Sequence, residues 1–425
     1  MAKFIVEGGA RLSGEITPAG NKNAALPLIA AALLTDEPVT LQNLPAIRDV
    51  DVMLDIAAKL GAKVERQERA VTISGSLTTS SLDPQRAGEI RASLLFAGPV
   101  LARCGKVSVP RPGGDIIGRR RVDTHFLALE SLGAELSTEP REYRLVAKKL
   151  APADVVLDEA SVTATESALM CASLIPGRTV IHNAASEPHV QELARFLVAM
   201  GARIDGIGTN TVAIEGTSTL HGASHRISSD HMEVGSFIGL AAVTKSELII
   251  KDAMPEHLRM TRLVFERLGV RTQVEGGDLR VLRQDRYLIE PDIGGAVPEI
   301  KPQPWPGFPT DLTSIATVVA TQSEGIVLVH EWMFEGRLYF VDVLSREMGA
   351  RIVLCDPHRA VVMGPSQLYG AELRSPDIRA GMALLAAALA AKGTSVINNV
   401  EQVDRGYERL DERLRGLGAR IERVV

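Results

Sequence analysis

A short phrase built around a glycine recurs six times along this chain of 425 residues. It reads AKLGAKVE at residues 58–65 and RGLGARIE at residues 415–422. The copies lie about 70 residues apart, a spacing typical of a structural repeat. In each copy a helical pattern ends at the glycine and a strand-like pattern follows. The six glycines are Gly61, Gly133, Gly201, Gly269, Gly349 and Gly418. We therefore predict six copies of one α/β unit.

A second phrase occurs once per unit and consists of an apolar helix, a turn and a strand. It reads NAALPLIAAALLTDEPVTLQNL at residues 23–44 and DIRAGMALLAAALAAKGTSVINNV at residues 377–400. These helices carry Ala, Leu and Ile on nearly every face, so we expect them to be buried inside the sheets, in an inside-out arrangement. Six units divide naturally into three per domain. The C-terminal RIERV is expected to pair with the N-terminal AKFIVEG, which gives an N-terminal domain of residues 21–229 and a C-terminal domain of residues 1–20 with 230–425.

The composition excludes several classes of protein. Cys104, Cys171 and Cys355 lie far apart without a CxxC pair, so neither a disulfide framework nor a zinc site is indicated. The net charge of −5 argues against non-specific binding to nucleic acid. The first residues lack the apolar core of a signal peptide, and the longest apolar run is too short to span a bilayer. We expect a cytoplasmic protein without a membrane partner, in which a local cationic cluster holds any anionic substrate.

Charged and polar residues stand at the starts of the repeated apolar helices. A helix N-terminus presents free N–H groups and the positive end of the helix dipole, and both favour phosphate and carboxylate ligands. The residues at these equivalent positions are Lys22, Asn23, Arg91, Asp311, Asp377 and Arg379. Each cation alone would more often be a solvated surface charge. Their shared position in the repeats predicts an anion-binding site.

A strongly cationic segment, VPRPGGDIIGRRRVDTH, covers residues 109–125. Its adjacent glycines and the absence of a helical or strand period predict a mobile loop. The alternative is a charged surface hairpin in which Asp115 forms a turn after Gly114. Its arginines are Arg111, Arg119, Arg120 and Arg121, and a further cation, Arg405, lies before the last helix.

A repeated α/β chain of this kind also has a non-catalytic interpretation, because ring-forming clamps and other scaffolds use repeated units. Such a scaffold would spread its basic residues along the helix faces. Here the basic residues gather at helix starts, which favours an enzyme.

Seven motifs, taken together, resemble those of the UDP-N-acetylglucosamine 1-carboxyvinyltransferases, a family of enolpyruvyl transferases. The motifs are AGNKNAALPLIAAALL, RASLLFAGP, PGGDIIGRRRVDTH, FPTD, FEGR, DIRAG and VDRGYERL, and their order and spacing match over essentially the whole chain. The related 5-enolpyruvylshikimate-3-phosphate synthases typically open with a GSKS-type motif, which is absent here. The resemblance implies a two-domain inside-out α/β barrel of six βαβαββ-type units whose cleft closes around its substrates.

The activity implied by the resemblance is transfer of the enolpyruvyl group of phosphoenolpyruvate to the 3-hydroxyl of UDP-N-acetylglucosamine, with release of phosphate. This is the first committed step of peptidoglycan synthesis, and so of cell wall biogenesis, cell shape and cell division. It implies no metal, no cofactor and no obligate protein partner. The alternatives are transfer to another nucleotide or sugar, and the non-catalytic scaffold.

The resemblance also implies a set of site residues. The implied catalytic residues are Asp115 as general acid, Asp311 as the base near the 3-hydroxyl, and Lys22. The implied contacts to phosphoenolpyruvate are Lys22, Arg91, Arg120, Arg337, Arg379 and Arg405. The implied contacts to UDP-N-acetylglucosamine are Asn23, Arg91, Arg120, Val122, Asp123, His125, Ser161, Val162, Asp311 and Met333. Taken alone, His125 would more often be a structural histidine.

The chain departs from the usual family pattern at four positions. In the cationic loop, Asp115 replaces the common cysteine and Arg121 replaces a proline. Fosfomycin inactivates family members by alkylating that cysteine, so the resemblance implies fosfomycin resistance here. In the segment LDEASVTATES (157–167), Glu159 stands where many members have Lys, and Thr163 where they have Gly. The loss of a cation beside the uracil keeps another acceptor open as an alternative.

Overall fold

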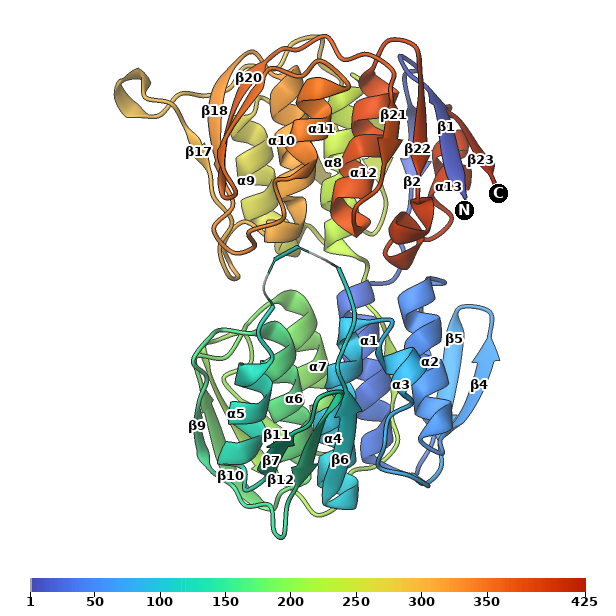
Figure 1. Cartoon of the computed structure of the whole chain (residues 1–425), viewed down its shortest axis with the longest axis vertical. Helices are drawn as coiled ribbons and strands as arrows, with labels where there is room; N and C mark the ends of the chain where they lie inside the picture. Colours follow the sequence, from blue (N-terminus) through green and yellow to red (C-terminus); the bar gives the residue numbers. More distant parts are fainter. Residues whose placement is uncertain (1, 116, 119) are drawn as a thin grey trace. The chain divides into compact units, whose positions relative to one another are not determined.

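The computed structural model describes residues 2–115, 117–118 and 120–425, which form two compact units (Figure 1). Unit 1 contains residues 1–19, 116–120 and 229–425, and unit 2 contains residues 20–115 and 121–228. The chain therefore changes unit at 19/20 and 228/229, next to the predicted boundaries. The prediction places all of 21–229 in one domain, whereas 116–120 group with unit 1.

Within the described residues, each unit has three sheets around a core of helices. In unit 1 the first sheet has the strand order β21 (Glu372–Arg374), β22 (Thr394–Asn398), β1 (Lys3–Glu7), β23 (Arg420–Val424). The second has the order β15 (Thr272–Glu275), β16 (Asp278–Val281), β14 (Glu247–Ile250), β2 (Ser13–Ile16). The third has the order β17 (Glu299–Ile300), β18 (Gly325–His330), β20 (Arg359–Gly364), β19 (Ile352–Asp356). In unit 2 the first sheet has the strand order β11 (Arg203–Asp205), β12 (Thr211–Gly216), β10 (Gly177–His182), β9 (Asp154–Val156). The second has the order β13 (Ser224–Arg226), β3 (Val39–Gln42), β5 (Ala70–Ser74), β4 (Lys63–Gln67). The third has the order β6 (Lys106–Pro110), β8 (Glu142–Val146), β7 (Glu135–Thr138).

The helices follow the same division. Those of unit 2 are α1 (Lys22–Ala31), η1 (Ala32–Leu34), α2 (Arg48–Lys59), α3 (Pro84–Ala87), η2 (Arg91–Phe96), α4 (Ala97–Cys104), α5 (Asp123–Ser131), α6 (Val162–Ser173) and α7 (Pro188–Ala199). Those of unit 1 are α8 (His231–Val243), η3 (Pro255–His257), α9 (Arg259–Arg267), η4 (Ile293–Gly295), η5 (Thr310–Leu312), α10 (Thr313–Gln322), α11 (Phe340–Arg346), α12 (Ile378–Ala390), η6 (Val400–Arg405) and α13 (Leu410–Gly416).

The predicted inside-out arrangement is confirmed. Every residue of α8 is buried, and α12 is buried from Ile378 to Leu389, because apolar side chains cover all faces of both helices. These helices pack on each other and on α10, and the sheets of unit 1 lie outside them (Figure 1). In unit 2 the helices α1, α4 and α6 form the equivalent core.

The repeat glycines end helices as predicted. All six have a positive φ, from 81° at Gly349 to 115° at Gly61, a backbone region that glycine enters without steric cost. They follow α2, α5, α7, α9, α11 and α13, and each leads into the outermost strand of its sheet. The six repeated phrases are therefore six copies of the same helix-to-strand corner.

The two ends of the chain lie in one sheet. Strand β1 pairs antiparallel with β23 on one side, with Phe4 opposite Arg423, and with β22 on the other. This confirms the predicted pairing of RIERV with the N-terminal strand. The first strand of the sequence thus belongs to the same unit as the last helices.

Two repeated helices differ from the prediction at their starts. The segment RASLLF forms the 3₁₀ turn η2 before α4, and Asp311 lies in the 3₁₀ turn η5 before α10. The tighter turn changes the direction in which the first residues point, so Arg91 and Asp311 are not at α-helical positions equivalent to Lys22.

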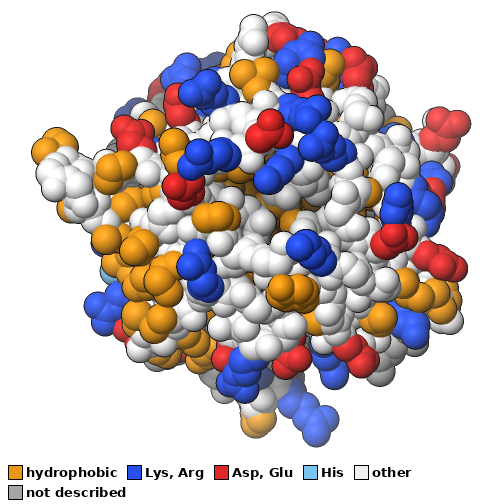
Figure 2. All heavy atoms as spheres, turned by 90° about the horizontal axis from the view of Figure 1, so that it is seen from above, with side chains coloured by type: hydrophobic (Ala, Val, Ile, Leu, Met, Phe, Trp, Pro, Cys, Tyr) orange, Lys and Arg blue, Asp and Glu red, His pale blue; other side chains and the backbone are white. Residues whose placement is uncertain are grey.

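The surface of the molecule carries mixed charge. On the face drawn in Figure 2, lysine and arginine side chains are interspersed with acidic ones and do not form a continuous basic field. None of the helices in the described part of the chain has the length and apolar character that a membrane span requires.

Candidate active site

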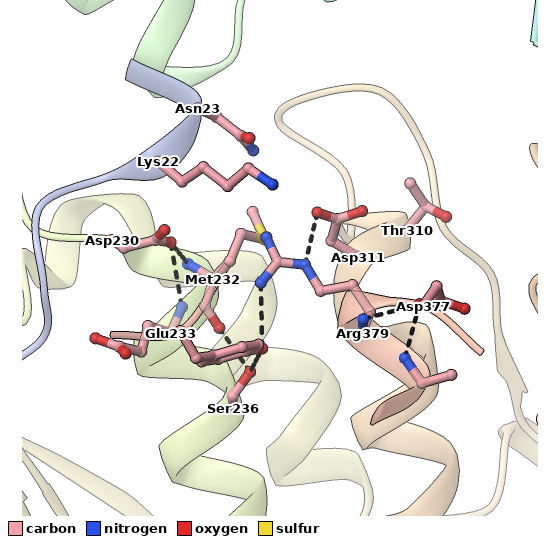
Figure 3. Close-up of polar contacts among 12 residues, drawn as sticks. Lys22, Asn23, Asp230, Met232, Glu233, Ser236, Thr310, Asp311, Asp377 and Arg379 are labelled. Atoms are coloured by element: carbon pink, nitrogen blue, oxygen red, sulfur yellow. Dashed lines mark hydrogen bonds and ion pairs between the residues drawn. The ribbon is translucent and has the colours of Figure 1, made fainter. Parts of the chain in front are cut away.

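In unit 1, the start of α12 is held by Asp377. Its carboxylate accepts hydrogen bonds from the backbone N–H groups of Arg379 (2.8 Å) and Ala380 (2.9 Å) and so caps the helix (Figure 3). The Arg379 side chain is only 7% exposed, and its Nη1 donates to the hydroxyl of Tyr407 at 3.1 Å. The cap and the tyrosine together fix the direction of this guanidinium.

Asp311 lies between two buried arginines. Its Oδ2 accepts from Nε of Arg379 at 2.9 Å, and its Oδ1 accepts from Nη2 of Arg337 at 3.0 Å (Figure 3 shows the first contact). Burial by itself would lower the pKa of Arg379, but the negative charge of Asp311 contributes to holding it well above its ordinary value. Arginine side chains stay protonated in proteins, so this cluster of two arginines and one aspartate carries one positive charge in excess.

Arg337 keeps one donor unused. The residue is 4% exposed, and its Nε has no hydrogen-bond partner among the described residues. The ring centroid of Phe334 lies 5.3 Å from the guanidinium of Arg337 and 6.0 Å from that of Arg120. A buried donor without a partner costs free energy, so an anionic ligand that accepts from Nε would be favoured here.

In unit 2, the start of α1 brings a lysine into a buried ion pair. Asn21 caps the helix by accepting from the N–H groups of Asn23 (2.9 Å) and Ala24 (3.3 Å). Lys22 Nζ lies 2.7 Å from Oδ2 of Asp49, and both side chains are almost completely buried. The amphipathic helix α2 positions Asp49 in its first turn. The predicted cation at this helix start is thus paired within its own unit.

Arg121 connects the end of the cationic loop to the start of α5. Its guanidinium donates to Asp158 at 2.8 Å and to Asp123 at 3.3 Å. Nη2 of Arg91 donates to the backbone carbonyl of Arg121 at 2.5 Å. Asp158 also accepts from the hydroxyl of Thr124 at 2.6 Å, and this hydrogen bond and Arg121 lower its pKa. The residue that replaces the family proline is therefore an anchor of the loop.

The starts of α5 and α6 carry half of the residues predicted to contact UDP-N-acetylglucosamine. Helix α5 packs against α6. His125 is 2% exposed, and its Nε2 lies 2.7 Å from Oγ1 of Thr163. The predicted residues at these two helix starts are Val122, Asp123, His125, Ser161 and Val162. Thr163, one of the departures from the family pattern, thus contacts the histidine, whereas Glu159 is exposed.

The remaining predicted residues are placed as follows. Arg111 anchors the other end of the loop by donating to the carbonyls of Pro140 and Glu139 and to the hydroxyl of Tyr143. Beyond Asp115, the carbonyl of Ile117 accepts from the N–H of Gly336 at 3.0 Å. Arg405 lies at the end of η6 and donates to Gln402. Arg119, which the prediction includes in the cationic loop, lies outside the described residues.

Several partners of these residues were not predicted from the sequence. They are Asp49, Thr163 as a partner of His125, Tyr407 and Glu331, whose carboxylate accepts from Thr310 and Thr313 beside Asp311. The motif VDRGYERL contains Tyr407 and was the one sequence signal that could have pointed to any of these partners. Among the described residues no group of three His, Cys, Asp or Glu side chains could hold a metal ion.

Comparison with known proteins shows the family to which the chain belongs. Residues 6–414 match the EPSP synthase family, described as 3-phosphoshikimate 1-carboxyvinyltransferase. The chain belongs to the EPSP synthase family. Within it, a protein of Bradyrhizobium diazoefficiens is 59% identical over 425 residues, which cover 99% of this chain and 98% of that protein. One of Treponema denticola is 54% identical and covers 99% of both chains. Both are named UDP-N-acetylglucosamine 1-carboxyvinyltransferase, which confirms the predicted resemblance.

Solved structures of an enolpyruvyl transferase and of an EPSP synthase share the fold. The enolpyruvyl transferase NikO from Streptomyces tendae has a TM-score of 0.88 at 24% identity and covers 100% of this chain, with 99% of its own chain matched. An EPSP synthase from Acinetobacter baumannii has a TM-score of 0.76 at 17% identity, with both chains covered completely. The predicted enolpyruvyl transferase fold is therefore confirmed.

Replacement of the helix cap should weaken unit 1 measurably. Asp377→Ala removes the acceptor for two N–H groups at the start of α12, and loss of such a cap typically costs about 0.5–2 kcal/mol of unfolding free energy. Urea unfolding measures the difference. The matched control is Asp342→Ala, which removes an exposed ion pair with Arg346 and should cost less than about 0.5 kcal/mol. Equal losses in the two variants would contradict the capping role.

Proposed function

We propose that this chain transfers the enolpyruvyl group of phosphoenolpyruvate to the 3-hydroxyl of UDP-N-acetylglucosamine and releases phosphate. The observation that carries the proposal is the cluster of Asp311, Arg337 and Arg379 in a chain whose full-length relatives at 52–59% identity are UDP-N-acetylglucosamine 1-carboxyvinyltransferases. In a bacterium this reaction belongs to peptidoglycan synthesis, and its two substrates are water-soluble, so we place the enzyme in the cytoplasm.

The excess positive charge of the cluster suits phosphoenolpyruvate. The substrate carries a phosphate and a carboxylate, and a planar guanidinium binds either with two parallel hydrogen bonds. The Nε of Arg337 is an unused donor. In the absence of substrate, Nη2 of Arg337 and Nε of Arg379 both donate to Asp311. The proposed phosphoenolpyruvate contacts are Lys22, Arg91, Arg120, Arg337, Arg379 and Arg405. Lys22 and Arg91 belong to unit 2, and the other four belong to unit 1.

Binding of the anion would release Asp311 for its role as base. Without substrate, both carboxylate oxygens of Asp311 accept from arginine donors. Phosphoenolpyruvate competes for the same donors, and an oxygen that loses its arginine can accept the proton of the sugar hydroxyl. The cluster thus couples the presence of one substrate to the activation of the other.

The reaction proceeds by addition and elimination. The 3-hydroxyl oxygen bonds to C2 of phosphoenolpyruvate, its proton passes to Asp311, and Asp115 supplies a proton to C3. In the second step C3 loses a proton, the double bond forms again, and the C2–O bond to phosphate breaks. Lys22 and the arginines stabilise the negative charge throughout. The proposed contacts to the sugar nucleotide are Asn23, Arg91, Arg120, Val122, Asp123, His125, Ser161, Val162 and Met333, besides Asp311.

A second candidate is transfer to a different acceptor. Two residues favour it, Glu159 and Thr163, because the resemblance implies other residues at these positions near the proposed nucleotide contacts. Thr163 contacts His125, one of those proposed contacts. A changed nucleotide pocket would alter the base or sugar that is accepted. The scaffold alternative receives no support, because the family consists of enzymes.

An acceptor screen tests the proposal. Phosphate release from phosphoenolpyruvate is followed with UDP-N-acetylglucosamine, UDP-N-acetylgalactosamine, UDP-glucose, CDP- and GDP-sugars and shikimate 3-phosphate, and products are identified by mass. We expect kcat/KM for UDP-N-acetylglucosamine to exceed the others by at least about tenfold, a difference of 1.4 kcal/mol in transition-state binding. A higher kcat/KM for any other acceptor would replace the proposal by the second candidate.

A further inference from the structure

Glu331 is a completely buried carboxylate just beyond the end of β18. Its exposed fraction is 0%, and its backbone is held at both ends of the peptide: its N–H donates to the carbonyl of His358 at 2.7 Å, and its carbonyl accepts from Nδ1 of His358 at 2.7 Å. The position of the carboxylate is therefore fixed by the sheet. The Glu331 side chain therefore contacts neither solvent nor a partner at the surface.

The two oxygens of Glu331 serve two different segments. Oε2 accepts from the hydroxyls of Thr310 at 2.7 Å and Thr313 at 3.1 Å, which lie on either side of Asp311. Oε1 accepts from the backbone N–H groups of Met333 at 3.0 Å and Phe334 at 3.3 Å, in the segment that leads to Arg337. One planar group thus spans the segment that carries the base and the segment that carries an arginine.

The second segment lies outside regular secondary structure. Residues 331–339 contain no strand and no helix. Apart from the bonds to Oε1, its backbone is held by the contacts of Glu331 itself, by the N–H of Gly336 to Ile117, and by local turns at Arg337, Leu338 and Tyr339. The indole of Trp332 donates to the carbonyl of Pro302 at 2.6 Å, and Leu338 is completely buried. The carboxylate of Glu331 thus ties the start of this segment to residues on both sides of Asp311, whose Oδ1 lies 3.0 Å from Nη2 of Arg337.

We propose that Glu331 is a positioning residue that holds Asp311 and Arg337 in register for the transfer reaction. The inference deepens the proposed function and rests on it. Glu331 acts only through the two segments, since its four acceptor contacts are all with Thr310, Thr313, Met333 and Phe334. Burial raises the pKa of its carboxyl, while the two threonines, the N–H of Met333 and the charge of Arg337 oppose the shift. The residue is thus suited to a fixed geometric role.

Glu331→Gln is the most informative variant. The amide keeps the size and one acceptor oxygen, so the contacts to the threonines can persist, but its NH₂ group cannot accept from the N–H groups of Met333 and Phe334. We expect kcat per folded molecule to fall about 10- to 100-fold, because a displacement of the order of 1 Å in a reacting group costs up to about 10² in rate. The Kd of UDP-N-acetylglucosamine should change less than about threefold, or 0.65 kcal/mol.

The matched control is Asp411→Asn. Asp411 is also buried in unit 1 and forms ion pairs with Arg415 and Arg423, outside the candidate site. It should lose stability without any change of kcat per folded molecule. A second variant, Thr313→Val, removes one donor to Oε2, and a double-mutant cycle with Glu331→Gln should give an effect on kcat that is not additive, because both changes act on one network.

Amide hydrogen exchange provides a readout that does not depend on the reaction. The N–H groups of residues 333–337 should exchange faster in Glu331→Gln, while those of Asp411→Asn keep the rate of the unmodified protein. Unchanged exchange of this segment would overturn the positioning role whatever the substrate. Unchanged kcat with faster exchange would overturn its link to catalysis. A failure of the unmodified enzyme to use UDP-N-acetylglucosamine would refute the proposed function alone, and the kcat comparison would then be made with the acceptor found in the screen.

Discussion

Asp115→Cys is expected to make this enzyme sensitive to irreversible inactivation by fosfomycin, which the unmodified enzyme should resist. The epoxide is opened by a soft, strongly nucleophilic thiolate, and an aspartate carboxylate is a much poorer nucleophile for this reaction. The substitution places sulfur at the position where the resemblance to the UDP-N-acetylglucosamine 1-carboxyvinyltransferases implies a cysteine. We expect time-dependent and complete loss of phosphate release in the variant, and no time-dependent loss in the unmodified enzyme.

The native cysteines provide an internal control for this experiment. Cys104 and Cys355 are exposed thiols and Cys171 is buried. Burial raises the pKa of Cys171 to about 12 and also raises that of Cys104, so neither forms a thiolate readily. Mass spectrometry of the peptides should place the adduct that accompanies loss of activity at residue 115 of the variant, whereas any adduct at the exposed Cys355 should form equally in the unmodified enzyme. An adduct in the active-site loop of the unmodified enzyme, with irreversible loss of activity, would refute the assignment of Asp115.

The same substitution should change the dependence of activity on pH. A general acid must be protonated when it acts, and carboxylic acids lose their protons at lower pH than thiols do. The optimum of Asp115→Cys is therefore expected at higher pH than that of the unmodified enzyme. Asp115→Asn should be nearly inactive over the whole range, because an amide cannot supply the proton to C3.

The repeat made most of the fold predictable. The glycines at the helix ends and the apolar helices recur in every unit, so each copy supports the interpretation of the others. The structure confirms both features, with a positive φ at Gly61 and complete burial of α8. The 3₁₀ turn at Arg91 was not predictable, because RASLLF has the same apolar pattern as an α-helix start and the choice between the two depends on tertiary packing.

The site was predictable only in part, for a related reason. Helix starts can be read from local sequence, and Lys22 and Arg379 do lie there. Their partners come from distant parts of the chain: Asp311 precedes Arg379 by 68 residues, and Glu331 has no motif of its own. A sequence shows which residues can bind an anion. It does not show which carboxylate holds them before the substrate arrives.

Asp311→Asn is expected to reduce kcat by at least about 100-fold while the protein stays folded. The amide has nearly the same size, and its oxygen can still accept from one arginine. It cannot take a proton from the sugar hydroxyl, so addition to phosphoenolpyruvate stops. The measurement is phosphate release at saturating concentrations of both substrates. Asp342→Asn, which removes only an exposed ion pair with Arg346, should keep the kcat of the unmodified enzyme.

Binding measurements separate loss of the base from loss of the site. The two buried arginines of Asp311→Asn lose their shared negative partner, so their excess charge rises and phosphoenolpyruvate meets less competition for their donors. Its affinity should therefore be equal to or higher than in the unmodified enzyme, and UDP-N-acetylglucosamine should still bind. Calorimetric titration tests both. A variant that retained more than about a tenth of kcat would show that another group takes the hydroxyl proton, because removal of a general base typically costs 10²–10⁴-fold. Weaker binding of phosphoenolpyruvate together with loss of kcat would instead mean that Asp311 serves mainly to hold Arg337 and Arg379 in place.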